Sequence, residues 1–197
     1  MLIRRHQHGF TIVELMIGVV LLAIVLAIGG PSFATWLQNT QIRTMSEAVK
    51  DGLQLARAEA VRRNARVRFQ LVDVLTDSCA LSTAGPNWVV SMDSAAGACA
   101  STNMADDAAP AAPRIVQIRS AGDGSANAVV SADQSSIEFN GLGQVVAAAS
   151  IAINVTNPTG GACAASSGPM RCLRIVATPG GQIRMCDPRS GFGSEGC

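Results

Sequence analysis

The chain has 197 residues and a net charge of +1, with 48% hydrophobic and only 15% charged residues. This length suffices for one membrane helix and one ordinary domain, and the near-neutral charge gives no bulk electrostatic reason to bind nucleic acid. The only two histidines, His6 and His8, lie at the very start, and there is no tyrosine. Because the net charge is close to zero, any contact with nucleic acid would have to come from a local patch of basic residues.

The first predicted element is a membrane-spanning helix over residues 10–31. The 21 residues that end at Gly30 contain a single charged side chain, that of Glu14. At a rise of about 1.5 Å per residue they reach about 30 Å, the thickness of a bilayer core. A secretory signal has a shorter apolar region with its cleavage site after that region. Here the small residue Gly9 stands before it, so cleavage there would remove residues 1–9 as a leader and keep the helix.

Glu14 is the unusual feature of this apolar run. A charge deep in a membrane helix costs about 3 kcal/mol or more, so it usually marks a function. One interpretation is that Glu14 reaches the headgroups and is favoured by the helix dipole. Another is that cleavage after Gly9 leaves Phe10 with a free amine, which is the natural partner for Glu14 of the same or a neighbouring chain. The second interpretation also accounts for the spacing of these residues.

The stretch Gly-Phe-Thr-Ile-Val-Glu-Leu-Met at residues 9–16 resembles the type III signal of type IV pilins and type II secretion pseudopilins. The resemblance implies that a prepilin peptidase cuts between Gly9 and Phe10 and N-methylates Phe10. It also implies that Glu14 guides docking into a filament of other pilins or pseudopilins. Pro31 falls where pilins often carry a helix-kinking proline. This similarity covers about the first thirty residues, so it indicates the superfamily and not the member.

Residues 32–64 are expected to continue the helix as an amphipathic segment. Its apolar residues recur largely at spacings of four, at Phe33, Leu37, Met45, Val49, Leu53, Ala56 and Ala60. Such a stripe packs on a domain while the opposite face meets solvent or neighbouring subunits. We therefore expect one long helix, half in lipid and half on the domain, with a kink at Pro31.

Five arginines gather where this helix ends and the next strand begins, namely Arg57, Arg62, Arg63, Arg66 and Arg68. The first interpretation is favourable charge near a helix C-terminus together with solvated strand positions. The second is a contact surface for an acidic neighbour or for nucleic-acid phosphates.

Residues 65–197 are predicted to form a β-rich periplasmic domain. Alternating apolar residues and turn signals place its strands at 67–71, 87–92, 114–119, 136–140, 150–156, 173–178 and 182–186. The connection at 93–113 is long for a compact domain. The expected fold class is α+β and pilin-like, with a long N-terminal helix, in a membrane half and an amphipathic half, packed on an antiparallel β-sandwich-like domain.

The cysteines and basic residues set the expected orientation. All six cysteines follow the apolar run, which favours disulfides in an exported domain. Arg4 and Arg5 precede the run and the next basic residue is Arg43, so the N-terminus is expected in the cytoplasm and the chain in the inner membrane. A zinc site is disfavoured, since there is no C-x-x-C spacing and no nearby histidine. Of fifteen pairings, nearest-neighbour pairing gives Cys79–Cys99, Cys163–Cys172 and Cys186–Cys197.

The order of helix, strands and closing hairpin also resembles the H-type pseudopilins and the related minor pilins FimT and FimU. The segments that carry this similarity are Phe-Asn-Gly-Leu-Gly at residues 139–143 and Ile-Arg-Met-Cys-Asp-Pro at residues 183–188. The resemblance implies a minor subunit near a filament tip and not the bulk subunit.

Catalysis is disfavoured. Loss of the leader would remove both histidines, and paired cysteines would leave no thiol nucleophile, so an anchored periplasmic enzyme is the weakest hypothesis. No cofactor is expected. Asn103, Asp106 and Asp107 could hold calcium, but a solvated loop is preferred and no metal site is predicted.

The main functional hypothesis is a structural subunit that primes or caps a type IV pilus or a type II secretion pseudopilus. The alternative is a DNA-binding minor pilin for DNA uptake in natural transformation. Some family members use a C-terminal Gly-Arg-x-Arg motif for this, but the matching residues 181–184 read Gly-Gln-Ile-Arg, so the first arginine is absent. The remaining candidate DNA contacts are Arg171, Arg174, Arg184 and Arg189, which are few enough that binding would be weak and salt-dependent.

Overall fold

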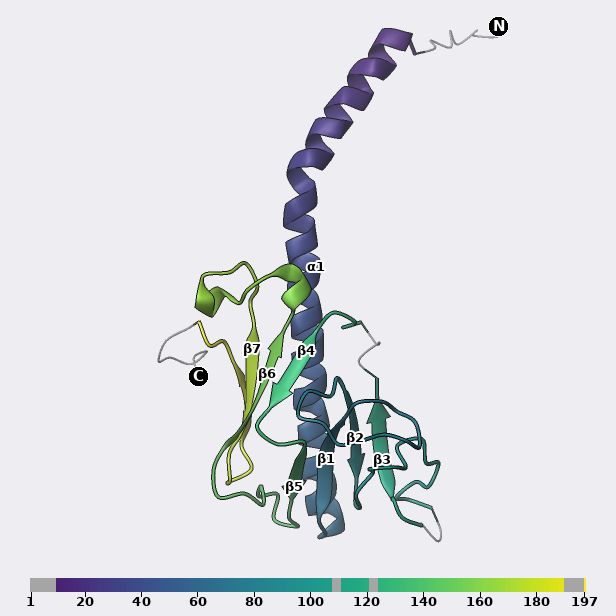
Figure 1. Cartoon of the computed structure of the whole chain (residues 1–197), viewed down its shortest axis with the longest axis vertical. Coiled ribbons are helices and arrows are strands. Elements are labelled where there is room, and N and C mark those ends of the chain that lie inside the picture. The colour runs from purple at the N-terminus through teal and green to yellow at the C-terminus, as the bar shows by residue number, and fades with distance from the viewer. Residues whose placement is uncertain (1–9, 108–110, 121–123, 190–196) are drawn as a thin grey trace, which may run out of the picture.

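The computed structural model describes residues 10–107, 111–120, 124–189 and 197. One long helix, α1 (Ile12–Arg63), projects from the domain by its first half, and two antiparallel sheets lie against its second half (Figure 1). This architecture confirms the predicted α+β fold class. Gly9 and the rest of the predicted leader lie outside the described residues.

The ends of α1 are set by local chemistry. Thr11 precedes the helix in an extended conformation, and its side chain accepts a hydrogen bond from the backbone N–H of Glu14. Asn64 ends the helix in the left-handed conformation, with φ 47° and ψ 44°, and its N–H bonds to carbonyl groups of the last turn. Asparagine adopts this conformation more readily than other non-glycine residues, which makes it a suitable helix terminator.

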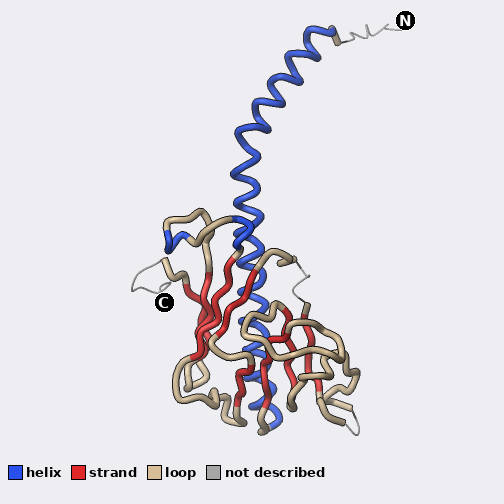
Figure 2. The backbone as a smooth tube through the Cα atoms, in the orientation of Figure 1, coloured by secondary structure: helices blue, strands red, loops and turns tan. Residues whose placement is uncertain are grey.

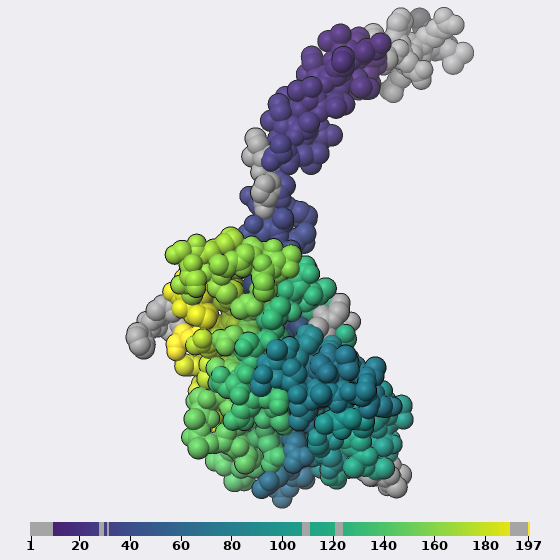
Figure 3. All heavy atoms as spheres, in the orientation of Figure 1, coloured from purple at the N-terminus to yellow at the C-terminus, as the bar shows by residue number. Residues whose placement is uncertain are grey.

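The helix changes direction between its two halves. Residues Ile12–Ala27 and Ser32–Arg63 lie at 42° to each other, and the bend falls across the segment that contains Pro31. Figure 3 shows the first half extending well beyond the packed atoms of the domain. No single straight helix among the described residues is long and apolar enough to cross a membrane, whereas these two segments together meet that criterion.

The first sheet has the strand order β3-β2-β1-β5 and is antiparallel throughout. Its strands are β1 (Val67–Val72), β2 (Asn87–Ser91), β3 (Ile115–Arg119) and β5 (Ser136–Phe139). Irregular connections surround this sheet in Figure 2.

The second sheet has the order β4-β6-β7-β8 and is also antiparallel. Its strands are β4 (Val129–Ala132), β6 (Ile151–Thr156), β7 (Leu173–Ala177) and β8 (Ile183–Cys186). Two short 3₁₀ helices, η1 (Pro158–Gly160) and η2 (Ala164–Ser166), lie between β6 and β7. The four-residue strand β4 was not predicted, because it is short and is followed closely by polar turn residues.

The core lies between α1 and both sheets. The helix contributes Ile42, Met45, Val49, Leu53, Ala56 and Ala60, all of which are buried. The predicted stripe is therefore correct from Met45 onward but wrong at its start. Phe33 and Leu37 are 60% and 42% exposed, because this part of α1 lies beyond the sheets.

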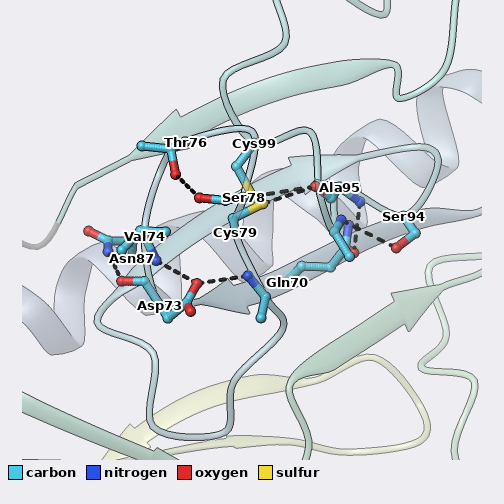
Figure 4. Close-up of a disulfide and its surroundings, with 12 residues drawn as sticks. Gln70, Asp73, Val74, Thr76, Ser78, Cys79, Asn87, Ser94, Ala95 and Cys99 are labelled. Carbon is cyan, nitrogen blue, oxygen red and sulfur yellow. Dashed lines mark hydrogen bonds between the residues drawn. A yellow bond between two sulfur atoms is a disulfide. The ribbon is translucent and has the colours of Figure 1, made fainter.

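The six cysteines are joined as Cys79–Cys99, Cys163–Cys172 and Cys186–Cys197, which are the pairs that the nearest-neighbour rule predicts. Figure 4 shows the first of them near Ala95 and the buried Gln70. Gln70 donates to Ser91 Oγ at 2.7 Å and accepts from the N–H of Ala95 at 3.1 Å. This bridge and these contacts hold the loop after β2 on the outer side of the first sheet, over a second small core.

Candidate functional site

The first turn of α1 forms a capped helix start. Thr11 Oγ1 accepts from the Glu14 N–H at 3.2 Å, and Glu14 stands in the first turn, where the helix dipole favours a negative charge. Thr and Glu at this spacing form the sequence signature of a capping box. That signature, which the sequence reasoning missed, predicts the observed helix start at Ile12 and not at Phe10.

Glu14 and Phe10 are both open to contact. Phe10 is 85% exposed and Glu14 is exposed, and no side chain in the described part of the chain pairs with the Glu14 carboxylate. The carboxylate is therefore available to a group on another molecule.

The first half of α1 is an apolar surface that the domain does not cover. Each large apolar side chain in it is at least 51% exposed, namely Ile12, Val13, Leu15, Met16, Ile17, Val19, Val20, Leu21, Leu22, Ile24, Val25 and Leu26. A continuous apolar surface of this length requires lipid or protein to cover it. The site of interest is therefore an assembly or membrane surface.

The five clustered arginines do not form one free basic surface. Arg62 and Arg63 both bind Glu59, at 2.8 and 2.7 Å, while Arg66 and Arg68 bind Glu138 at 3.0 and 2.8 Å. These four arginines therefore stabilise the helix end and its junction with the first sheet.

Arg57 differs from the other four, because the described residues supply it with no carboxylate partner. It lies on the exposed face of α1, one helical turn before Val61. Arg57 is therefore the one member of the predicted cluster to which the second interpretation, a contact for an acidic neighbour, still applies.

The predicted calcium candidates are used for other contacts. Asp106 accepts from Arg62 and Arg63, and the Asp107 carboxylate accepts from the Met104 N–H at 2.8 Å. The hydrogen bond from Arg62, with that from Arg63, holds the pKa of Asp106 below its ordinary value. Across residues 10–107, 111–120, 124–189 and 197, no cluster of three or more His, Cys, Asp or Glu side chains could hold a metal ion.

The candidate DNA-contacting arginines fall into two pairs. Arg171 Nε lies 2.8 Å from the buried Asp187 carboxylate, and the backbone N–H of Arg189 donates to the same carboxylate. Arg174 donates to Asn154 at 2.7 Å, whereas Arg184 is exposed. The strand register places Arg174 opposite Cys186 and Arg184 opposite Val176, so these two side chains lie on the same outward face.

A groove runs between α1 and the edge strand β8. Its volume is about 570 Å³, and it is lined by Trp36, Asn39, Thr40, Arg43, Arg171, Leu173, Met185, Cys186 and Asp187. The exposed ring of Trp36 also stacks on that of Phe33, with the ring centroids 5.8 Å apart. The groove is lined by apolar side chains such as Trp36 and Leu173 and by Arg171 and Asp187, which are paired with each other.

Comparison with known families identifies both parts of the chain. Residues 4–30 match the prokaryotic N-terminal methylation motif, and residues 46–191 match the family of type II transport protein GspH. The chain belongs to the GspH family. No individual curated protein matches its sequence significantly.

The chain also resembles a solved structure in its fold. It is similar to the crystal structure of the type IV minor pilin FimU of Pseudomonas aeruginosa, with 14% identity and a TM-score of 0.50, over 75% of this chain and 98% of FimU. A second crystal form of FimU gives 14% identity and a TM-score of 0.49, over 79% and 98%. Pilins and pseudopilins are structural subunits and not enzymes, and the N-terminal motif implies membrane anchoring and association with a pilus.

Proposed function

We propose that this GspH-family chain is a minor subunit that primes or caps a type IV pilus or a type II secretion pseudopilus. A prepilin peptidase would cut between Gly9 and Phe10 and methylate the new amino group of Phe10. The chain would then sit in the inner membrane through residues 10–31, with its N-terminus in the cytoplasm and residues 65–197 in the periplasm, until assembly extracts it.

The observation that carries this proposal is the combination of an uncovered apolar helix with the Glu14 carboxylate, which has no side-chain partner among the described residues. In lipid, Glu14 near the helix start can reach the headgroups or pair with an amine. In a filament, neighbouring apolar helices replace the lipid, and Glu14 then needs a cationic partner to offset the cost of its burial. The methylated amine of Phe10 in an adjacent subunit has the required charge.

The three disulfides and the arrangement of basic residues support the topology. Disulfides form in oxidising compartments such as the periplasm, and the Cys186–Cys197 bridge attaches the last residue to the folded domain. Arg4 and Arg5 before the apolar run favour a cytoplasmic N-terminus.

The test uses the substitution Glu14→Gln, which keeps the size of the side chain and removes its charge. We expect the variant to be cleaved and membrane-bound in amounts equal to wild type, but to be at least tenfold depleted from sheared filaments. The control is Asp51→Asn, an exposed carboxylate on the second half of the same helix. Wild-type incorporation of Glu14→Gln would refute the role given to this carboxylate.

DNA capture is the second candidate function. The observation in its favour is that Arg174 and Arg184 share the outward face of β7 and β8. Arg171 contributes less than expected, because it is held on the buried Asp187. With about two readily available cations, the domain would bind DNA weakly and through phosphates alone.

A further inference from the structure

We propose that the exposed aromatic pair Phe33 and Trp36 anchors the chain at the periplasmic surface of the inner membrane and holds the near end of the domain against the lipid headgroups. The pair lies on α1 where the helix first meets the domain. This inference rests on the membrane anchoring in the proposed function. It adds the depth at which the chain sits in the bilayer and the end of the domain that meets the lipid.

The two rings form an aromatic surface that the fold leaves uncovered. They stack with their centroids 5.8 Å apart, and Trp36 is 59% exposed. The other tryptophan of the chain, Trp88, is 2% exposed, which is the ordinary state of so large an apolar ring. Tryptophan combines an apolar ring with one polar N–H group, so it suits a membrane interface, where acyl chains and headgroups meet.

The aromatic residues of α1 stand at both ends of its apolar run. Phe10 precedes the run and is exposed, whereas Phe33 and Trp36 follow it. No aromatic residue lies between Phe10 and Phe33 in the sequence. Membrane helices carry their aromatic residues in the same arrangement, with one belt at each interface.

The distance between the two aromatic ends matches the thickness of a bilayer. At about 1.5 Å per residue, Phe10 and Trp36 are about 39 Å apart along the helix. The 42° bend reduces this to about 36 Å along the membrane normal. A bilayer has a hydrocarbon core of about 30 Å and measures about 40–45 Å with its headgroup regions. Both residues therefore fall in the headgroup regions and outside the core.

The residues after Trp36 mark the change from lipid to water. Residues 38–41 are the first four consecutive polar residues after the apolar run and read Gln-Asn-Thr-Gln. From Ile42 onward the apolar stripe of α1 is buried in the domain. The exposed aromatic pair therefore lies between the part of the helix that needs lipid and the part that the domain covers.

The domain is attached directly to α1 beside this pair. The side chain of Asn39 accepts from the backbone N–H of Arg171, just before β7, at 2.6 Å. The buried Asn157 donates to the backbone carbonyl of Gln38 at 3.4 Å. These contacts begin two residues after Trp36, so no flexible spacer separates the aromatic pair from the domain. Anchoring of Trp36 at the interface therefore also sets the height of the domain above the membrane.

The end of the domain that carries η1 and η2 is the end nearest to the aromatic pair. In Figure 1 both short helices lie at the end from which the first half of α1 projects. The groove between α1 and β8 includes Trp36 in its lining, together with the polar Asn39 and Thr40. With Trp36 at the interface, this end of the domain faces the headgroups, and the end with the C-terminus of α1 points away from the membrane.

Quenching by brominated lipids tests this inference with the full-length, processed chain. The chain is reconstituted in phosphatidylcholine vesicles whose acyl chains carry bromine near the headgroups or, in a second preparation, near the bilayer midplane. Bromine quenches tryptophan emission only at close contact. The Trp36→Phe variant leaves Trp88 as its sole tryptophan, and Trp88 lies in the core of the domain. The Trp36 emission is therefore the difference between wild type and this variant.

We expect bromine near the headgroups to reduce the Trp36 emission at least twofold, and bromine near the midplane to reduce it less. The Trp36→Phe variant, which circular dichroism should show to be folded, should lose no emission in either preparation. Stronger or equal quenching from the midplane would overturn the interfacial position of Trp36. Quenching of Trp36→Phe to the same extent as wild type would overturn it as well.

A matched control places an exposed tryptophan at the other end of the domain. The double variant Trp36→Phe, Val61→Trp moves the exposed tryptophan to a position on the same helix where Val61 is 51% exposed. We expect no quenching of its emission, because this position points away from the membrane. Quenching as strong as in wild type would show that the domain lies flat on the bilayer, and would overturn the inference.

Flotation of the vesicles in a density gradient separates this inference from the proposed function. A wild-type chain that does not float with the vesicles would overturn the proposed membrane anchoring, and this inference with it. A chain that floats with the vesicles but shows no quenching of Trp36 would overturn this inference alone.

Discussion

Arg63 donates to the Asp106 carboxylate at 2.7 Å, and thereby attaches the long loop before β3 to the last turn of α1. The same guanidinium donates to Glu59 at 2.7 Å and to the carbonyl oxygen of Ala105 at 2.9 Å. Its side chain is only 14% exposed. One arginine therefore joins two segments that are more than forty residues apart in the sequence.

Replacement of Arg63→Met tests this attachment. The variant keeps much of the side-chain volume but leaves a mostly buried Glu59 with fewer partners, so we expect a loss of about 1–3 kcal/mol in the free energy of unfolding. The control is Arg43→Met, which removes an exposed pair with Glu47 and should cost about 0.5 kcal/mol or less. Chemical denaturation of the detergent-solubilised chain, followed by tryptophan fluorescence, measures both.

Acid should destabilise the domain. The hydrogen bond from Arg62 lowers the pKa of Glu59, and the hydrogen bond from Arg114 lowers that of Asp93. Carboxyl groups whose pKa is lowered by folding stabilise the folded state above their unfolded pKa values, near pH 4, and this contribution is lost as the pH falls through the folded values.

We therefore expect the unfolding temperature to be constant from pH 7 to about pH 5 and to fall below about pH 4. Asp93→Asn should reduce the decrease in unfolding temperature below about pH 4, because the side chain at this position no longer titrates. The same substitution should lower the unfolding temperature at pH 7. A variant with the same acid dependence as wild type would show that the Asp93–Arg114 pair does not contribute. Circular dichroism at a series of pH values provides the measurement.

Local signals made the fold largely predictable from the sequence. The apolar run from Phe10 to Gly30 and the spacings of four residues after it indicated one long helix. Those spacings also indicated the half of the helix that packs on the sheets. The spacing of Thr11 and Glu14, which is that of a capping box, also indicates where the helix starts, although the sequence prediction did not use it. The strand β4 was missed, since only Val129 and Val130 in it are large and apolar.

Contacts between distant segments were not predictable. Nothing in the sequence near Asp106 indicates that it binds Arg62 and Arg63, because that pairing depends on where the fold places a loop of low complexity. The arginine cluster was interpreted either as favourable charge near a helix C-terminus or as a contact surface, and neither interpretation included Glu138, which strand pairing brings beside Arg68. Among the described residues, Arg57 alone of these five has no carboxylate partner, so it retains the role that a basic cluster suggests.

The contact between Gly181 and Gly143 gives a sharp stability prediction. Gly181 has φ +82°, and a Cβ atom there would lie 1.9 Å from the carbonyl oxygen of Gly143. Gly181→Ala should therefore destabilise the domain by about 1–3 kcal/mol or more, through backbone strain and displacement of the turn. The neighbouring Gly180→Ala is the matched control, because its Cβ meets nothing within 4 Å, and it should be neutral or slightly stabilising.

DNA binding provides the last prediction, and it depends on the outward face of β7 and β8. Arg174 and Arg184 are diagonal neighbours across these strands, about 7–8 Å apart, and can contact successive phosphates. With about two such contacts, affinity should fall roughly tenfold between about 50 and 200 mM salt. Arg184→Glu should abolish a low-salt gel shift, whereas Arg43→Glu, an exposed arginine on α1, should leave it in place. If the wild-type chain gives no shift at low salt and high protein concentration, DNA capture is eliminated and the assembly role alone remains.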